Sequence, residues 1–360
     1  MRTVRDIQIF QNIPILVRAA LNVPDENEKV VNEYRLRRAL PTIRYLAEKG
    51  ARVVLIGHLG EKGTETLKPV SEALGALIRG VSFFGETVGV RARARVRDLA
   101  PGNILVMENL RRHRGERAND RAFVKELASL ADIFVEDSFD TCHRPYASIV
   151  GVPNILPSYA GFLLQEEINE LSRALTPKKP AFAVIGGAKF STKEGVLNAL
   201  LQTYDRVFVG GALANDFLKA SGKEVGKSLV SDITDEKEIT KILANPRLVL
   251  PIDSVMKDGA ILDHGPRTNA LLAELSAKAK TILWNGPLGK YESGFVGATN
   301  AFARAVADSS ARSVVGGGDT IAAIENLGLL PRFSFVSTGG GAMLQFLAQG
   351  TLPGIEALNT

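Results

Sequence analysis

Cysteine is nearly absent from this chain, since Cys142 is the single one among 360 residues. One cysteine cannot form an internal disulfide, and its rarity is typical of proteins from reducing compartments. Histidine is scarce as well, with four residues, and no obvious catalytic dyad can be picked out among them. The sequence therefore excludes a disulfide-stapled scaffold and gives no support to histidine-based acid–base catalysis.

Long apolar runs are missing too. The start, MRTVRDIQIFQNIPILVRAA, has one short apolar stretch that Gln11, Asn12 and Pro14 interrupt, which is unlike a signal peptide. No later run is long enough to cross a bilayer. Hydrophobic residues make up 45% and charged residues 23%, an ordinary balance for a globular protein. We expect a cytoplasmic enzyme.

The length of 360 residues suits two domains. Both halves alternate apolar β-branched runs with amphipathic stretches such as residues 35–49, which predicts an α/β fold with two doubly wound, Rossmann-like parallel sheets. The expected strands are 13–18, 52–56, 81–84, 104–107 and 133–136, then 181–185, 206–209, 247–250, 281–284, 313–316 and 333–336. We expect domains at 1–165 and 166–345, joined by the helical stretch 161–177 with a cleft between them, and a tail at 346–360 that packs toward the first domain.

The net charge of +5 is unevenly placed. Residues 1–165 hold 24 Lys and Arg against 19 Asp and Glu, whereas residues 166–360 hold 20 of each. Of the 24 cations in the first half, 19 are arginine, whose planar fork suits phosphate and carboxylate groups. A solvated surface explains part of this excess, such as RARARVR at 91–97. Because no basic motif with interleaved aromatics indicates nucleic acid, we expect an acidic small substrate on the first domain.

Glycine-rich loops follow four strand candidates of the second half: AFAVIGGAK (181–189), RVFVGGA (206–212), SVVGGGDT (313–320) and FSFVSTGGGA (333–342). Any one of them could be only a tight turn. Four in succession, however, fall on the carboxyl edge of a parallel sheet, where backbone N–H groups at helix starts bind phosphate oxygens. Lys189, Lys193 and Asp319 add the cations and the metal-binding carboxylate that phosphoryl chemistry requires. The second half is therefore predicted to bind a nucleotide.

Two similar patterns are set aside. SGKEVGKS (221–228) is one residue short of the Walker spacing and has no strand before it, so we do not expect a phosphate loop there. Ile321 and Leu344 occupy the third glycine position after the G-x-G pairs at 316 and 339, which argues against a dinucleotide fingerprint.

The motifs, taken in order, identify a family. The chain resembles phosphoglycerate kinase from end to end, and the resemblance implies transfer of a phosphoryl group between 1,3-bisphosphoglycerate and ADP, with magnesium. Such an enzyme takes small-molecule substrates, binds neither nucleic acid nor membrane, and is usually a monomer. The matching blocks are LVRAALNVP (16–24), YRLRRALPTIRYL (34–46), GHLG (57–60), ENLRRH (108–113), EDSFDTCHR (136–144), GGAKFSTK (186–193), LDHGP (262–266), WNGPLGKYE (284–292), GGGDT (316–320) and VSTGGGA (336–342).

The resemblance also implies roles in the second domain. Lys189 would meet the transferring phosphoryl group together with the amides of Gly339, Gly340 and Gly341, and Asp319 would hold magnesium. Trp284 is expected in the core. The residues implied in nucleotide binding are Lys193, Gly211, Asn285, Glu292, Gly316, Gly317, Gly318, Asp319 and Thr320.

On the first domain the implied triose-binding residues are Asn22, Arg35, His58, Arg111 and Arg144. Arg35 would also contact the transferring phosphoryl group, so the domains must close before transfer. Taken alone, Arg35 would be an exposed helix-start arginine and His58 a surface or capping histidine.

Two departures from the family pattern affect the triose side most directly, and Asp140, Cys142 and Ala212 also differ from that pattern. Ala20 stands where the family has an aspartate, and Glu61 stands where it has a phosphate-binding arginine. Lys62 or Arg112 could replace that arginine. These departures leave two alternatives beside an active phosphoglycerate kinase: a phosphotransferase for another acidic substrate, and a catalytically weak nucleotide-binding paralogue. The joint presence of Arg35, Lys189 and Asp319 argues against the second alternative, because a protein that only binds a nucleotide needs no residues for the transition state.

Overall fold

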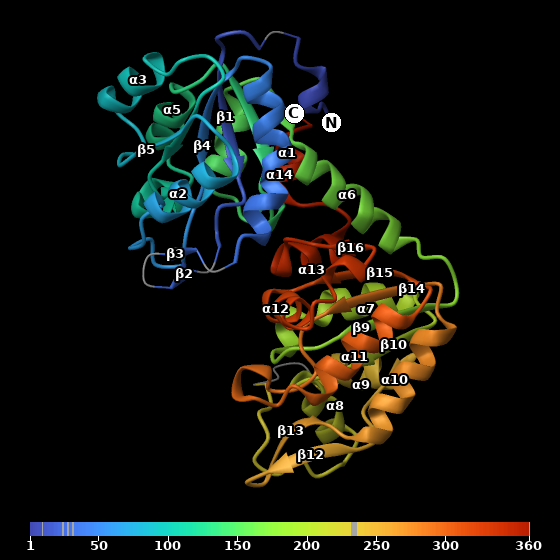
Figure 1. The fold of residues 1–360 in the computed structure, drawn as a ribbon. Coiled ribbons are helices and arrows are strands. Elements are labelled where there is room, and N and C mark those ends of the chain that lie inside the picture. The colour runs from blue at the N-terminus through green and yellow to red at the C-terminus, as the bar shows by residue number, and fades with distance from the viewer. Residues whose placement is uncertain (9, 24, 27–28, 31, 232–235, 360) are drawn as a thin grey trace. The chain divides into compact units, whose positions relative to one another are not determined.

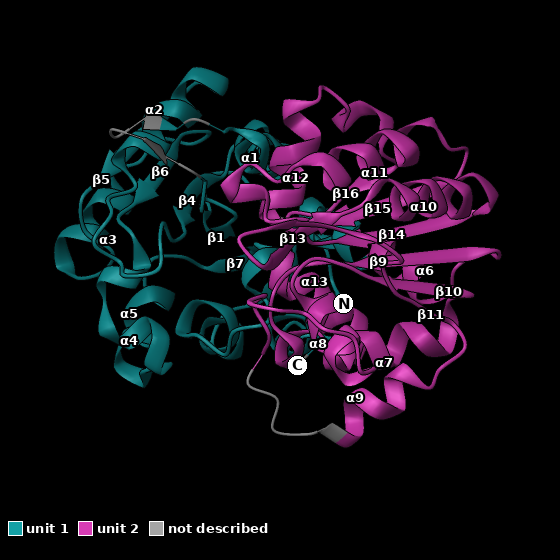
Figure 2. Ribbon diagram, turned by 90° about the horizontal axis from the view of Figure 1, so that it is seen from below, with its two compact units in different colours: residues 1–168, 351–360 teal, residues 169–350 magenta. Residues whose placement is uncertain are grey.

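Two six-stranded parallel sheets form at the apolar runs of the two halves, as expected (Figure 1). The computed structural model describes residues 1–8, 10–23, 25–26, 29–30, 32–231 and 236–359. Pro24, the last residue of the first block, lies outside them. The chain divides into unit 1, Met1–Ile168 with Thr351–Thr360, and unit 2, Asn169–Gly350 (Figure 2).

The sheet of unit 1 has the strand order β5-β6-β4-β1-β7-β8, and every neighbouring pair is parallel. Val17 in β1 lies between Leu55 of β4 and Val135 of β7, and all three side chains are fully buried. The strands are β1 Pro14–Ala19, β4 Arg52–Ile56, β5 Val81–Phe84, β6 Ile104–Met107, β7 Ile133–Asp137 and β8 Ser158–Ala160, with the short pair β2 Asp25–Glu26 and β3 Lys29–Val30 outside the sheet.

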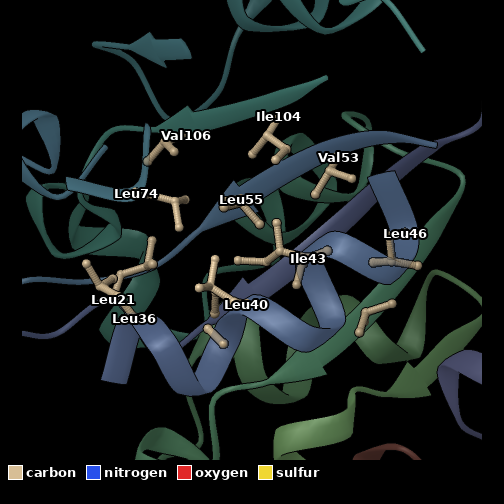
Figure 3. Packing of buried hydrophobic residues seen from close by; sticks show 14 of the residues in the cluster. Leu21, Leu36, Leu40, Ile43, Leu46, Val53, Leu55, Leu74, Ile104 and Val106 are labelled. Carbon is tan, nitrogen blue, oxygen red and sulfur yellow. The ribbon is translucent and has the colours of Figure 1, made fainter. Parts of the chain in front are cut away.

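Helix α1 buries its apolar face against this sheet (Figure 3). Leu36, Leu40 and Ile43 lie three to four residues apart, so they share one side of the helix. They pack with Leu55 of β4 and Val106 of β6 in one buried cluster. The helices of unit 1 are α1 Tyr34–Glu48, α2 Lys68–Leu77, α3 Val90–Arg97, α4 Arg114–Ala118, α5 Arg121–Ala128 and the C-terminal α14 Pro353–Ala357.

The sheet of unit 2 has the order β11-β10-β9-β14-β15-β16 and is parallel throughout. Its strands are β9 Ala181–Ile185, β10 Arg206–Val209, β11 Leu248–Val249, β14 Thr281–Asn285, β15 Arg312–Gly316 and β16 Phe335–Val336. Trp284 is fully buried in β14, where it meets Phe302 edge to face, so its expected core position is confirmed.

The helices of unit 2 are α7 Glu194–Thr203, α8 Leu213–Ala220, α9 Glu236–Leu243, α10 Pro266–Lys278, α11 Gly297–Asp308, α12 Gly318–Asn326 and α13 Gly340–Gln349. An antiparallel hairpin, β12 Ser254–Lys257 with β13 Ala260–His264, was not expected from the sequence. Its turn is Asp258-Gly259, with φ of 54° and 81°, and Asp-Gly is a strong hairpin signal.

Helix α6, Phe162–Leu175, contains the boundary between the units. Its start is fixed inside unit 1, because Thr42 Oγ1 accepts a hydrogen bond from the Phe162 N–H and Asp137 Oδ1 accepts one from the Leu164 N–H. Residues 351–360 belong to unit 1, where the Gly354 N–H donates to the Cys142 carbonyl. Within the described residues, no helix is long and apolar enough to span a membrane.

Candidate functional site

The predicted triose-binding residues of unit 1 follow the carboxyl ends of its strands. Asn22 follows β1, His58 follows β4, Arg111 follows β6 and Arg144 follows β7. Because all these strands are parallel, their carboxyl ends meet at one edge of the sheet, where open α/β sheets bind ligands.

Hydrogen bonds connect Arg35, Asn22 and Arg111 through Gly60, which lies in the loop after β4. Arg35 at the start of α1 donates through Nη1 to the Asn22 carbonyl (2.5 Å), and Asn22 Oδ1 accepts from the Gly60 N–H (3.1 Å). Arg111 Nη1 donates to the Gly60 carbonyl (2.5 Å). The two guanidinium groups are thus fixed on either side of the Asn22–Gly60 contact.

His58 lies inside the protein, with an exposed fraction of 3%, so its interpretation as a surface histidine is wrong. Its Nδ1 lies 3.0 Å from Arg18 Nη2. Since arginine only donates, Nδ1 accepts, and a neutral His58 carries its proton on Nε2. Burial, followed by the charges of Arg18, Arg111 and Arg35, holds the pKa of His58 well below its usual value, so the ring is neutral at pH 7.

Arg18 contacts this candidate site, and the sequence reasoning did not single it out. It is 1% exposed in β1 and donates to Ser148 Oγ (3.1 Å) and the Ala19 carbonyl (3.0 Å). Ser148 in turn donates to the buried Glu116 (2.6 Å), whose pKa burial raises and the charge of Arg18 lowers. The sequence could have pointed to Arg18, because it is a charged residue inside the apolar run IPILVRAA. A charge that is buried with such a strand needs polar partners.

Several arginines gather at this edge of unit 1. Arg18, Arg35, Arg111 and Arg117 all act on His58 electrostatically, and burial lowers the pKa of the Arg111 guanidinium. Such a concentration of arginines suits an acidic ligand with phosphate and carboxylate groups. The Arg144 side chain is exposed, and no hydrogen bond or ion pair joins it to the other described residues of this cluster.

The two departing positions differ in their surroundings. Ala20 is fully buried, whereas Glu61 is exposed and lies close enough to Arg111 to favour its charged form. Arg112 forms an ion pair with Glu108 (2.9 Å), and Lys62 is exposed. Glu61 therefore puts a negative charge beside the arginine cluster.

In unit 2 the glycine loops approach one another at the carboxyl edge of the sheet. The Gly186 N–H donates to the Asn285 carbonyl (2.8 Å), and the Gly211 N–H donates to the Leu288 carbonyl (3.1 Å). A Cβ on Gly186 would overlap the Pro287 carbonyl oxygen, and Gly211 has a φ of 64°. These positions require glycine because backbone meets backbone there.

Lys193 lies among these loops. Its Nζ donates to Asn285 Oδ1 (3.0 Å), and burial lowers its pKa to about 8. Gly187 lies beside it with a φ of 105°, and a Cβ there would be in ordinary contact with Lys193 Cε, at 3.6 Å. A buried ammonium group held by one amide oxygen is suited to an anionic ligand.

The loop after β15 is another of the glycine loops around Asn285. Thr320 Oγ1 accepts from the Gly286 N–H (3.1 Å), and Asn285 Nδ2 lies 3.7 Å from the position of a Cβ on Gly317. Gly316 and Gly317 thus share an environment with Asn285, and Gly318 and Asp319 begin α12. Helix starts with free N–H groups bind phosphate.

A pocket of about 560 Å³ adjoins these loops. This volume is within the usual range of pockets that bind small molecules. Gly211, Glu292 and Asp319 line it, as do Leu262 and Leu288, which sequence reasoning did not single out. Its wall is otherwise mainly apolar, contributed by Ala188, Ala212, Leu229, Ala260, Ile261 and Pro287. The pocket therefore offers an apolar surface beside charged residues of both signs, since Lys227 and Lys290 line it together with Glu292 and Asp319.

SGKEVGKS (221–228) forms no strand–loop–helix unit, which agrees with its rejection as a phosphate loop. Gly226 makes an antiparallel bridge with Ala260 instead. Lys227 nevertheless lines the pocket, which the sequence did not predict.

Lys189, Gly340 and Gly341 do not line the pocket. Lys189 is exposed before the short helical turn Phe190–Thr192, and Gly340 and Gly341 open α13. A Cβ on Gly340 would lie 3.6 Å from Gly317 Cα, so the starts of α12 and α13 are neighbours.

Asp319 is not part of a group of metal-binding side chains among the described residues. Among the described residues, no group of three or more His, Cys, Asp or Glu side chains could hold an ion. One carboxylate beside a phosphate-binding loop fits Mg²⁺, which takes its remaining ligands from substrate phosphates and water.

Comparisons with known proteins agree over the whole chain. The family model described as phosphoglycerate kinase matches residues 4–350. The phosphoglycerate kinase of Moorella thermoacetica is 41% identical, covering 99% of this chain and 98% of its own. That of Azorhizobium caulinodans is 42% identical, with 96% coverage of both chains. The solved structure from Pyrococcus horikoshii is 32% identical with a TM-score of 0.90, covering 100% of this chain and 98% of its own; the one from Coxiella burnetii is 39% identical with a TM-score of 0.83, covering 99% and 98%.

Proposed function

The chain belongs to the phosphoglycerate kinase family, and on that premise we propose which of its residues perform each part of the reaction. Its activity is the reversible transfer of a phosphoryl group between the acyl phosphate of 1,3-bisphosphoglycerate and ADP, with 3-phosphoglycerate and ATP as the products. Named relatives that match nearly the full length favour this activity over that of a phosphotransferase for another acid.

The contact of Lys193 with Asn285 supports the proposal that unit 2 binds the nucleotide. Its buried ammonium group would bind nucleotide phosphates, and Asn285 holds it in place (3.0 Å). The N–H groups of Gly316 to Thr320 would border those phosphates. The nucleoside would lie in the 560 Å³ pocket beside Gly211, with Glu292 accepting from the ribose hydroxyls.

The arginine cluster of unit 1 supports binding of the triose there. Asn22, His58, Arg111 and Arg144 would hold 3-phosphoglycerate, with Arg111 oriented by the Gly60 carbonyl. His58 can offer its Nε2–H to a substrate oxygen, since Arg18 occupies Nδ1. Arg18 acts through His58 and is a positioning residue.

Phosphoryl transfer needs charge neutralisation rather than proton transfer, because a carboxylate is both nucleophile and leaving group. We assign Arg35 and Lys189 to the transferring phosphoryl group, together with the amides of Gly339, Gly340 and Gly341. Because the substrates are assigned to different units, the units must close around them before transfer, which also excludes water.

Asp319 is the residue that would hold Mg²⁺, at the start of α12 and on the rim of the nucleotide pocket. Bound there, the ion would neutralise phosphate charge. We further propose that the protein acts as a monomer in the cytoplasm.

A coupled assay with 3-phosphoglycerate, ATP and magnesium tests the assignment of Arg35. Arg35→Ala should lower kcat about 10²-fold or more, as expected when one strong transition-state donor is lost. Arg37→Ala is the matched control, because Arg37 lies on the same helix and pairs only with Glu33 at the surface in the described structure. If kcat of Arg35→Ala stays within about threefold of the parent, the assigned role is wrong.

A further inference from the structure

A second pocket of about 650 Å³ lies in unit 2 at the opposite edge of the sheet from the nucleotide loops. It surrounds the first residues of two strands, Thr281 of β14 and Arg312 of β15, whereas the nucleotide loops follow the last residues of these strands. No residue assigned to the phosphoryl transfer lines it.

The floor of this pocket is apolar. Ala174, Ala279 and Val314 line it and are each at most 6% exposed. The hydroxyl of Thr281 is already used, since it donates to the Lys178 carbonyl (2.9 Å). A bound molecule would therefore rest on packed apolar atoms and meet polar groups only around the rim.

The rim carries four cations: Arg173, Lys178, Lys280 and Arg312. Glu170 pairs with both arginines, at 2.8 Å from Arg173 and in close contact with Arg312, and so holds the two guanidinium groups together. Within the described part of the chain, the ammonium groups of Lys178 and Lys280 have no ion pair or hydrogen bond. Four cations against one carboxylate leave a net charge of +3 around the pocket.

We propose that this pocket binds a small soluble polyanion, a compound with at least two phosphate or carboxylate groups. Its volume is within the range of small-molecule sites. The two guanidinium groups offer planar forks for one anionic group, and the two lysines offer point charges for a second. Nucleic acid is a poorer match, because the pocket has no aromatic lining on which a base could stack.

Tripolyphosphate is a suitable probe, and isothermal titration calorimetry in metal-free buffer can measure its binding. The protein is first saturated with adenylyl imidodiphosphate and 3-phosphoglycerate, so that both assigned substrate sites are occupied. Separate titrations of these two ligands show whether they bind, so failure of the proposed function is seen independently. One further tripolyphosphate should then bind per chain.

Lys178→Ser combined with Lys280→Ser should weaken this binding at least tenfold. Lys223→Ser with Lys257→Ser is the matched control, because it removes the same charge from exposed positions of unit 2 that do not line the pocket. The control should change the dissociation constant less than twofold. All four lysines are exposed, so both variants should keep the parent's melting temperature. The absence of a third binding event, or equal weakening by both variants, would overturn the proposal.

Discussion

At the scale of single residues, Lys193 keeps an ammonium group in a place that water reaches poorly. Burial lowers its pKa to about 8, so the free protein loses this charge as the pH rises through that value. Bound phosphates favour the protonated form, so ADP affinity should fall above pH 8 and be about tenfold weaker at pH 9 than at pH 7. Calorimetric titration at each pH measures this.

Lys193→Arg is the matched variant for this prediction, because a guanidinium group stays charged throughout the range. Its ADP affinity should be lower than that of the parent at pH 7 but nearly independent of pH. A parent protein whose affinity is unchanged from pH 7 to pH 9 would show that the charge of Lys193 does not contribute to nucleotide binding.

Glu61 is the second residue with a testable consequence. Its carboxylate lies near Arg111 and should repel the non-transferring phosphate of the triose, so Glu61→Arg should lower KM for 3-phosphoglycerate several-fold. KM for ATP and kcat should change little, because the contact would be the same throughout the reaction. Glu72→Arg, on the exposed surface of α2, makes the same charge change and controls for net charge. A higher KM would mean that Glu61 has a structural role.

The sequence predicted which residues to examine in the candidate site, but not how they are held. The resemblance named Asn22, His58 and Arg111 as triose-binding residues, and the structure places all three after the carboxyl ends of strands in the sheet of unit 1. Their roles in catalysis and binding stay predictions. The contacts of Arg18 with His58 and Ser148 span 40 and 130 residues of sequence, and no local pattern encodes such a pairing.

At the scale of elements, the glycine loops depend on the close approach of two backbones. In Gly186→Ala the added methyl group would overlap the carbonyl oxygens of Gly286 and Pro287. These oxygens belong to the backbone of a closely packed loop and cannot move away freely. We expect a loss of about 1–3 kcal/mol in the free energy of unfolding and at least tenfold weaker ADP binding. Urea unfolding and calorimetry measure the two effects.

Gly195→Ala is the control for this loop. Gly195 lies in α7, where an added Cβ would make ordinary contact with Ala348 Cβ at 3.4 Å, so stability should stay unchanged or rise by up to about 1 kcal/mol. Equal stability of both alanine variants would show that the two loops can separate without cost.

The predicted strand bounds were met most closely in the sheet of unit 1. Strands β4, β5 and β6 have their expected bounds, although β5 is a half-buried edge strand. The expected runs 247–250 and 333–336 contain only β11 Leu248–Val249 and β16 Phe335–Val336, which are edge strands with one neighbour each. The three-residue β8 and the exposed β12 were missed, because neither has a long apolar run.

At the scale of the whole molecule, the predicted two-domain parallel α/β fold is confirmed, and the family match extends over residues 4–350. Composition contributed the charge asymmetry between the halves, and the structure shows an arginine cluster in unit 1. The proposed division of the two substrates between the units rests on this arrangement, in which each unit presents its own set of loops at the carboxyl edge of its own sheet.

Hydrogen–deuterium exchange with one substrate at a time tests this division most directly. 3-Phosphoglycerate alone should protect the loops of unit 1 around Asn22, His58 and Arg111, and ADP alone should protect those of unit 2 around Lys193 and Asp319. Each ligand should leave the assigned loops of the other unit unchanged. Protection of the unit 1 loops by ADP, or of the unit 2 loops by 3-phosphoglycerate, would contradict the assignment of the two substrates.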